Sequence, residues 1–215
     1  MTAGREPVRR FVVVGQTASA SGDFSTEDLP STSGRIDVLL RSVRAALLVS
    51  HGVRREVVVY LVLGGGERAP RVLKIAGRDI QFLRPDERSL ALLVKKALGR
   101  ETPQSSSAFV ELKPGLCVAE GGLDCVLADA PNATPYCLDE AGADLRDEPL
   151  DAQDSLFILG DHLGFDPASR ARIEALPCRI VSVGPVSLHT DDVVTLVTNE
   201  MDRRYRSSAS WAGST

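Results

Sequence analysis

Hydrophobic and polar positions follow two rhythms along the chain, one typical of buried strands and the other of amphipathic helices. Continuous apolar runs at Phe11–Val14 and Glu56–Leu63 predict strands that are buried on both faces of a sheet. Apolar residues at helical spacing predict one helix from Ile36 that stops near His51-Gly52. They predict another at 86–98, which has Asp86 as its N-cap and ends at Gly99.

Shorter patterns of the same two kinds fill the rest of the chain. Because strands alternate with helices, the sequence predicts an α/β fold, a mostly parallel sheet with helices on both faces. We expect a single domain at 1–205 and a flexible polar tail at 206–215. The remaining expected elements are a polar loop at 16–34, a hairpin at 71–84, a linker at 100–107, strands at 116–119, 136–138, 155–159 and 179–183, and helices at 123–127, 167–176 and 188–205. In the last helix, Leu188, Val193, Leu196, Val197 and Met201 can share one face.

Composition limits the class of protein. The chain has 215 residues, of which 43% are hydrophobic and 25% are charged, as is usual for a soluble globular domain. No stretch approaches the ~18 apolar residues of a membrane span. The apolar run near the start, Phe11–Val14, is too short for a signal-peptide core, so we expect a cytoplasmic protein without membrane contact.

Cysteine and histidine positions give no support to a metal site. The sequence has no C-x-x-C pair and no H-E-x-x-H motif. Cys117, Cys125, Cys137 and Cys178 are therefore predicted to be buried thiols that pack as small hydrophobes, and no metal is expected.

Charge is distributed unevenly between the two halves of the chain. Residues 1–100 hold 17 Lys and Arg against 10 Asp and Glu, whereas residues 101–215 hold 8 against 19. The basic half suggests a docking side for a phosphate-bearing partner, and basic helix faces exposed to solvent are an equally good explanation. The candidates for phosphate contacts are Arg54, Arg55, Arg71, Lys74 and Arg78.

Two glycine-bearing loops leave predicted strands at their carboxyl ends, where open α/β sheets bind ligands. They are Leu159–Gly164 and Val183–Leu188. Their glycines allow the backbone to approach a ligand closely, although each loop alone could be an ordinary strand-to-helix turn. Gly64–Gly66 lacks the spacing of a phosphate-binding loop and is interpreted as a turn.

Several short motifs occur together in a specific order. They are S-G-D-F at 21–24, G-R-I-D at 34–37, S-H-G-V-R at 50–54, P-D-E-R at 85–88 and S-V-G-P-V-S-L at 182–188. With these motifs the chain closely resembles, from about Arg10 to Arg204, the tRNA (pseudouridine-N1) methyltransferases of the TrmY type, members of the SPOUT superfamily.

The resemblance implies a C-terminal trefoil knot whose loops bind S-adenosylmethionine, and a homodimer. The family carries a cysteine in the cofactor pocket, in the first turn of the last helix, where this chain has Val193. The cofactor-binding residues that the resemblance implies are Leu138, Gly160, Val183, Gly184, Pro185, Val186, Ser187, Leu188 and Val193.

Methylation of pseudouridine N1 requires removal of a proton while the nitrogen attacks the methyl group. A carboxylate can accept that proton, and an arginine can stabilise the developing anion. Asp23 and Arg35, in the two N-terminal motifs that look most family-like, are the predicted catalytic residues. Asp23 could instead be a turn residue, and Arg35 could cover a helix start.

The expected partner is tRNA or another structured RNA. Three alternatives stay open at this stage: a methyltransferase that acts on a different RNA, one that acts on a small molecule or peptide amide, and an RNA-binding relative that has lost its activity.

Overall fold

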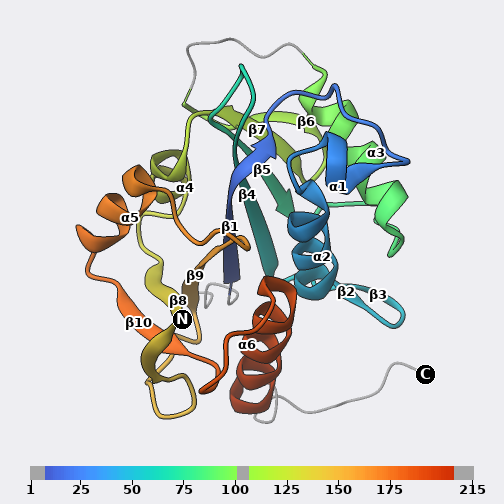
Figure 1. The fold of residues 1–215 in the computed structure, drawn as a ribbon. Helices are drawn as coiled ribbons and strands as arrows, with labels where there is room; N and C mark the ends of the chain where they lie inside the picture. Colours follow the sequence, from blue (N-terminus) through green and yellow to red (C-terminus); the bar gives the residue numbers. More distant parts are fainter. Residues whose placement is uncertain (1–7, 101–106, 206–215) are drawn as a thin grey trace.

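The computed structural model describes residues 8–100 and 107–205, and an eight-stranded sheet forms its centre (Figure 1). The strand order is β10-β8-β9-β1-β4-β5-β7-β6; neighbours are parallel from β10 to β4 and antiparallel from β4 to β6. The predicted α/β class and mostly parallel sheet are confirmed. The strands are β1 (Val8–Ser19), β4 (Val57–Gly65), β5 (Arg71–Ala76), β6 (Val110–Lys113), β7 (Leu116–Glu120), β8 (Thr134–Asp144), β9 (Asp154–Gly160) and β10 (Arg179–Ser182).

Helices cover both faces of this sheet because its central strands are apolar on both sides. Phe11 and Val13 of β1 belong to the core beneath α2, α3 and α6, whereas Val12 and Val14 belong to the core beneath α4 and α5. Figure 1 shows the two helix groups on opposite sides of the strands. The helices are α1 (Leu29–Thr32), α2 (Ile36–Leu47), α3 (Glu87–Leu98), α4 (Leu123–Asp129), α5 (Pro167–Glu174) and α6 (Thr190–Tyr205).

The first strand is longer than its apolar run predicts. It continues through the polar residues to Ser19, which pairs with Gly65 of β4, and Ala18 is fully buried. Strand pairing therefore extends past Gly15, and the polar loop begins later than expected and contains α1.

The predicted hairpin at 71–84 is wrong. Residues 71–76 form one strand, β5, which lies between β4 and β7 and pairs antiparallel with both. β5 forms its hairpin with the preceding strand, β4, and a separate short hairpin of β2 (Leu48–Val49) and β3 (Gly52–Val53) follows directly after α2, which ends at Leu47 rather than near His51. Local pattern could not distinguish these cases, because strand partners distant in sequence decide them.

The last helix begins at Thr190, two residues later than predicted, and its buried face matches the expected one only in part. Val194, Val197 and Met201 are fully buried, whereas Leu188 and Leu196 are about two-fifths exposed. Val197 and Met201 were expected on this face, and helical spacing alone did not decide between Val194 and Leu196 as their neighbours.

Other predictions have mixed outcomes. Asp86 caps α3 as expected, since its carboxylate accepts a hydrogen bond from the Ser89 backbone N–H at 2.8 Å. All four cysteines are free thiols; Cys125 and Cys137 are buried, and Cys117 and Cys178 are partly exposed. The tail at 206–215 and most of the linker lie outside the described residues.

Within the described ranges, no helix is long and apolar enough to cross a membrane. Nor do His, Cys, Asp and Glu of residues 8–100 and 107–205 gather in a group of three or more that could hold a metal ion.

Candidate functional site

A cavity of about 240 Å³ lies between β8, the carboxyl ends of β9 and β10, and the start of α6. The two glycine-bearing loops predicted from the sequence form part of its wall. All of the predicted cofactor-binding residues line the cavity except Pro185. The lining residues are Leu138, Asp139, Glu140, Leu159, Gly160, Asp161, Gly164, Phe165, Arg170, Val181, Ser182, Val183, Gly184, Val186, Ser187, Leu188, Thr190 and Val193.

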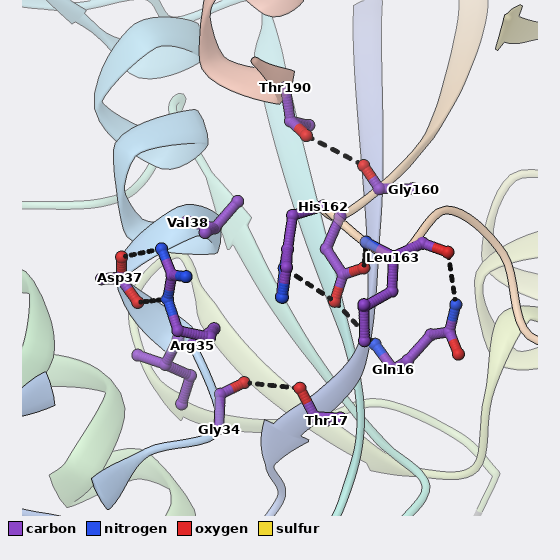
Figure 2. A network of polar contacts seen from close by, with 12 residues as sticks. Gln16, Thr17, Gly34, Arg35, Asp37, Val38, Gly160, His162, Leu163 and Thr190 are labelled. Carbon is purple, nitrogen blue, oxygen red and sulfur yellow. Dashed lines mark hydrogen bonds and ion pairs between the residues drawn. The ribbon is translucent and has the colours of Figure 1, made fainter. Parts of the chain in front are cut away.

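Two hydroxyl groups fix the loops around the cavity. The Ser182 hydroxyl donates to the Gly184 carbonyl at 2.6 Å and accepts from the Gly184 N–H at 3.2 Å. The buried Thr190 hydroxyl donates to the Gly160 carbonyl at 2.9 Å and so joins the start of α6 to the end of β9 (Figure 2). The cavity wall therefore has a defined shape before any ligand enters.

The wall combines apolar and charged groups. Leu138, Leu159 and Val193 provide an apolar surface that suits a flat aromatic base. The carboxylates of Asp139 and Glu140 suit a cationic ligand group, and Arg170 suits an anionic one.

Asp161 is a cavity residue that the sequence analysis did not select. Its side chain is 1% exposed, and its carboxylate accepts hydrogen bonds from the backbone N–H groups of Gln16 at 3.0 Å and Leu163 at 2.8 Å. The Gln16 side chain also donates to the Leu163 carbonyl at 3.0 Å, which ties this loop to β1 (Figure 2). Its position in G-D-H, directly after a buried strand, was the signal available in the sequence.

Arg35 lies at the N-cap position of α2 with a φ of 69°. Its guanidinium donates two hydrogen bonds to the Asp37 carboxylate, at 2.9 and 3.1 Å (Figure 2). These hydrogen bonds raise the pKa of Arg35, and the Asp161 carboxylate is near enough to contribute in the same direction. Burial opposes ionisation of Asp37, but hydrogen bonds from Arg35 and the charge of Arg41 hold the pKa of that carboxyl below its usual value.

Asp23 lies elsewhere. Its exposed carboxylate accepts a hydrogen bond from the Ser21 hydroxyl, which lowers the pKa of Asp23. Lys95 of α3 donates to the Phe24 carbonyl, and a β-carbon at Gly22 would lie 2.6 Å from the Lys95 carbonyl oxygen. The loop therefore packs on α3, and Asp23 does not line the cavity.

The basic residues proposed for phosphate contacts have different surroundings. Arg71 has no exposed surface; it donates to the Ala20 carbonyl at 3.0 Å and the Leu98 carbonyl at 2.9 Å and forms an ion pair with Glu120 at 3.0 Å. The prediction that Arg71 contacts phosphate is wrong, because its guanidinium is buried and bonds to Glu120 and to backbone carbonyls inside the fold.

Lys74 and Arg54 also have partners within the described chain. Lys74 pairs with Asp129 at 2.7 Å, and Arg54 pairs with Asp202 at 2.8 Å. Arg55 and Arg78 are exposed, so solvent-side contact with a phosphate remains a prediction for these two residues.

Comparison with known proteins gives consistent results. Residues 8–205 match the family model described as "Putative SAM-dependent RNA methyltransferase". The chain is 38% identical to the tRNA (pseudouridine(54)-N(1))-methyltransferase of Methanosarcina acetivorans over 196 residues, which cover 91% of this chain and 92% of that protein. It is also 38% identical to the protein of the same name from Halobacterium salinarum, over 91% of this chain and 96% of that one.

Among solved structures, the fold is similar to Archaeoglobus fulgidus Nep1 bound to S-adenosylhomocysteine. The TM-score is 0.61 at 16% sequence identity, with 91% of this chain and 98% of that chain covered.

Proposed function

The chain belongs to the family of SAM-dependent RNA methyltransferases, and we propose that it transfers a methyl group from S-adenosylmethionine to N1 of a pseudouridine in tRNA. The observation that carries this proposal is the cavity. It gathers the predicted cofactor loops at one place, in a chain whose relatives with 38% identity are named for that reaction.

The cavity residues fit S-adenosylmethionine by their chemistry. Leu138 and Val193 suit its adenine, the carboxylates of Asp139 and Glu140 suit its positive groups, and Arg170 suits its carboxylate. Bound there, the cofactor supplies an activated methyl group on a sulfonium. The protein then has to position the acceptor nitrogen and manage its proton.

We expect Val193→Trp to weaken S-adenosylmethionine binding at least tenfold, because Val193 lines the cavity and the larger indole would fill part of it. Isothermal titration with the cofactor measures the effect. Gly160 is a poorer site for this test, since a β-carbon there would lie 2.6 Å from the Gly164 backbone and disturb the loop itself.

Two variants control this measurement. Val193→Cys introduces the residue that the family carries, and it should bind the cofactor normally. Thr195→Trp places the same indole on an exposed position of α6 outside the cavity, and it should also bind normally. Unchanged affinity in a folded Val193→Trp protein would contradict this cofactor placement.

For the proton transfer, we propose that Arg35 stabilises the developing anion and that a carboxylate accepts the N1 proton. Asp161 is the first candidate for that acceptor, because it lines the cavity and Asp23 does not. Asp23, proposed from the sequence, is the second candidate. It requires the loop on α3 to move toward the cavity when RNA binds.

We also propose a homodimer and a C-terminal trefoil knot, as the family resemblance implies. Exposed apolar side chains near the cavity support the dimer: Val186 is 65% exposed and Leu188 43% on the loop before α6, and Leu196 is 42% exposed on that helix. Apolar surface of this kind is a frequent site of protein association.

Light scattering at micromolar concentration should therefore give about twice the 23.0 kDa of one chain. Leu196→Glu should reduce that mass, because a carboxylate would have to be buried in the contact. Leu92→Glu, a matched change on the outer side of α3, should leave it unchanged. A mass of one chain for the unmodified protein would refute the dimer.

The reaction itself is tested by mass spectrometry of nucleosides from tRNA that contains pseudouridine, after incubation with labelled cofactor. A labelled N1-methylpseudouridine supports the proposed function. Label on another nucleoside would indicate a different RNA target, and no label despite cofactor binding would favour a small-molecule or peptide substrate.

A further inference from the structure

The segment between β5 and α3 exposes an aromatic side chain that no part of the described fold covers. Phe82 is 93% exposed, more than any other large hydrophobic residue of the described chain. Its φ of 57° is in the left-handed region, which is a rare conformation for a bulky side chain. Both features are unfavourable for the isolated protein, so this residue is a candidate for function.

The neighbours of Phe82 hold it in this position. Ile80 is 1% exposed, and Leu83 packs against the core beneath α2 and α3. The chain is thus anchored on both sides of the exposed ring. A groove of about 490 Å³ runs beside the ring, lined by this segment, by residues of the β2–β3 hairpin such as Val49, and by Arg55, which follows the hairpin.

One arginine lines the groove beside the ring, and another follows the ring in the sequence. Arg55 lines the groove, and its guanidinium donates to the Gly77 carbonyl at 3.1 Å and the Arg78 carbonyl at 2.9 Å, which fixes its position. Arg84 is exposed two residues after Phe82. Two carboxylates lie on the same segment, Asp79 and Asp86, and that of Asp86 is engaged in capping α3.

An exposed aromatic ring with arginines beside it is the arrangement by which proteins bind unpaired bases. The ring stacks on the base, and the arginines contact the phosphates on either side. A double-stranded region offers no exposed base face, so the arrangement suits a loop or a splayed-out nucleotide.

We propose that Phe82 is a stacking platform for an unpaired base of the RNA substrate, with Arg55 and Arg84 at the adjacent phosphates. This proposal rests on the proposed function, because it requires an RNA substrate. The platform is separate from the cavity, with no lining residue in common, so it acts in RNA binding and not in cofactor binding.

The test measures binding of unmodified tRNA by fluorescence anisotropy at one fixed salt concentration. Phe82→Ala should weaken binding about 5- to 150-fold, the range for loss of one stacked base. Phe82→Gly should weaken it similarly, and because glycine adopts positive φ freely, this variant removes the ring without backbone strain. Phe82→Trp should retain affinity, since an indole also stacks.

Leu92→Ala, which shortens another exposed apolar side chain outside the groove, is the matched control and should bind tRNA normally. Titration of S-adenosylmethionine should give the same affinity in every variant. Normal tRNA binding by both Phe82→Ala and Phe82→Gly would overturn the platform and leave the proposed function intact.

Two other outcomes also count against the platform. If the unmodified protein binds cofactor but no RNA, the proposed function is refuted, and the platform is refuted with it because it requires an RNA substrate. If Phe82→Ala lowers the mass measured by light scattering, the ring belongs to a contact between copies of this chain and the platform is refuted.

Discussion

Asp161→Asn should reduce the single-turnover rate of methyl transfer about 10²–10⁴-fold, the usual range for loss of a general base. The amide cannot take up a proton, although it can still accept one of the two backbone hydrogen bonds that Gln16 and Leu163 donate. We therefore expect cofactor affinity to change less than the rate. Rapid-quench measurement with saturating enzyme gives the rate, and titration gives the affinity.

Two further variants identify the acceptor. Asp139→Asn removes an exposed carboxylate that we place beside the cofactor; it should weaken cofactor binding but have a small effect on the rate at saturating cofactor. Asp23→Asn tests the second candidate. If Asp23→Asn greatly reduces the single-turnover rate and Asp161→Asn does not, Asp23 accepts the proton. Its loop must then move away from α3 when RNA binds.

Loss of cofactor binding and rate together in Asp161→Asn would give a different result. Asp161 would then be a positioning residue that holds the cavity loop against β1. A near-normal rate in both Asp23→Asn and Asp161→Asn would show that water accepts the proton and that neither carboxylate is the base.

Arg35→Met should lower the single-turnover rate about 10²–10³-fold, as is typical when one donor to a developing anion is removed. The two hydrogen bonds to Asp37 fix the position of the guanidinium and favour its charged form. The group is therefore already oriented before the reaction begins. Arg35→Lys should keep part of the rate, because the charge remains and the paired geometry is lost. Arg35 does not line the cavity, so cofactor affinity should be unchanged.

Arg44→Met is a suitable control, since Arg44 is exposed on the same helix. Asp37→Asn is informative as well, because it would release Arg35 while the guanidinium stays in the protein. Wild-type turnover by Arg35→Met would exclude its role in stabilising the anion, and weaker cofactor binding in that variant would place it in the cofactor site instead.

Much of the fold could be predicted from the sequence because local physical rules determine it. The apolar run before Gly64 is buried as β4, the helical stripe from Ile36 forms α2, and Asp86 caps the start of α3. Strand carboxyl ends with glycines predicted the two loops of the cavity. The short sequence motifs indicated the family, and the family in turn indicated the methyl-transfer reaction.

What the tertiary structure decided were the contacts between residues distant in sequence. In the sequence, Arg71 is one of many basic residues in the first hundred positions. It is buried in the structure because β5 lies between β4 and β7, and its guanidinium donates to the Ala20 and Leu98 carbonyls. Asp161 becomes a candidate base only when β9 lies beside β1 and its carboxylate reaches the Gln16 N–H. A sequence shows which side chains can be charged or apolar, whereas the pairing of distant strands determines which of them are buried, paired or left facing a cavity.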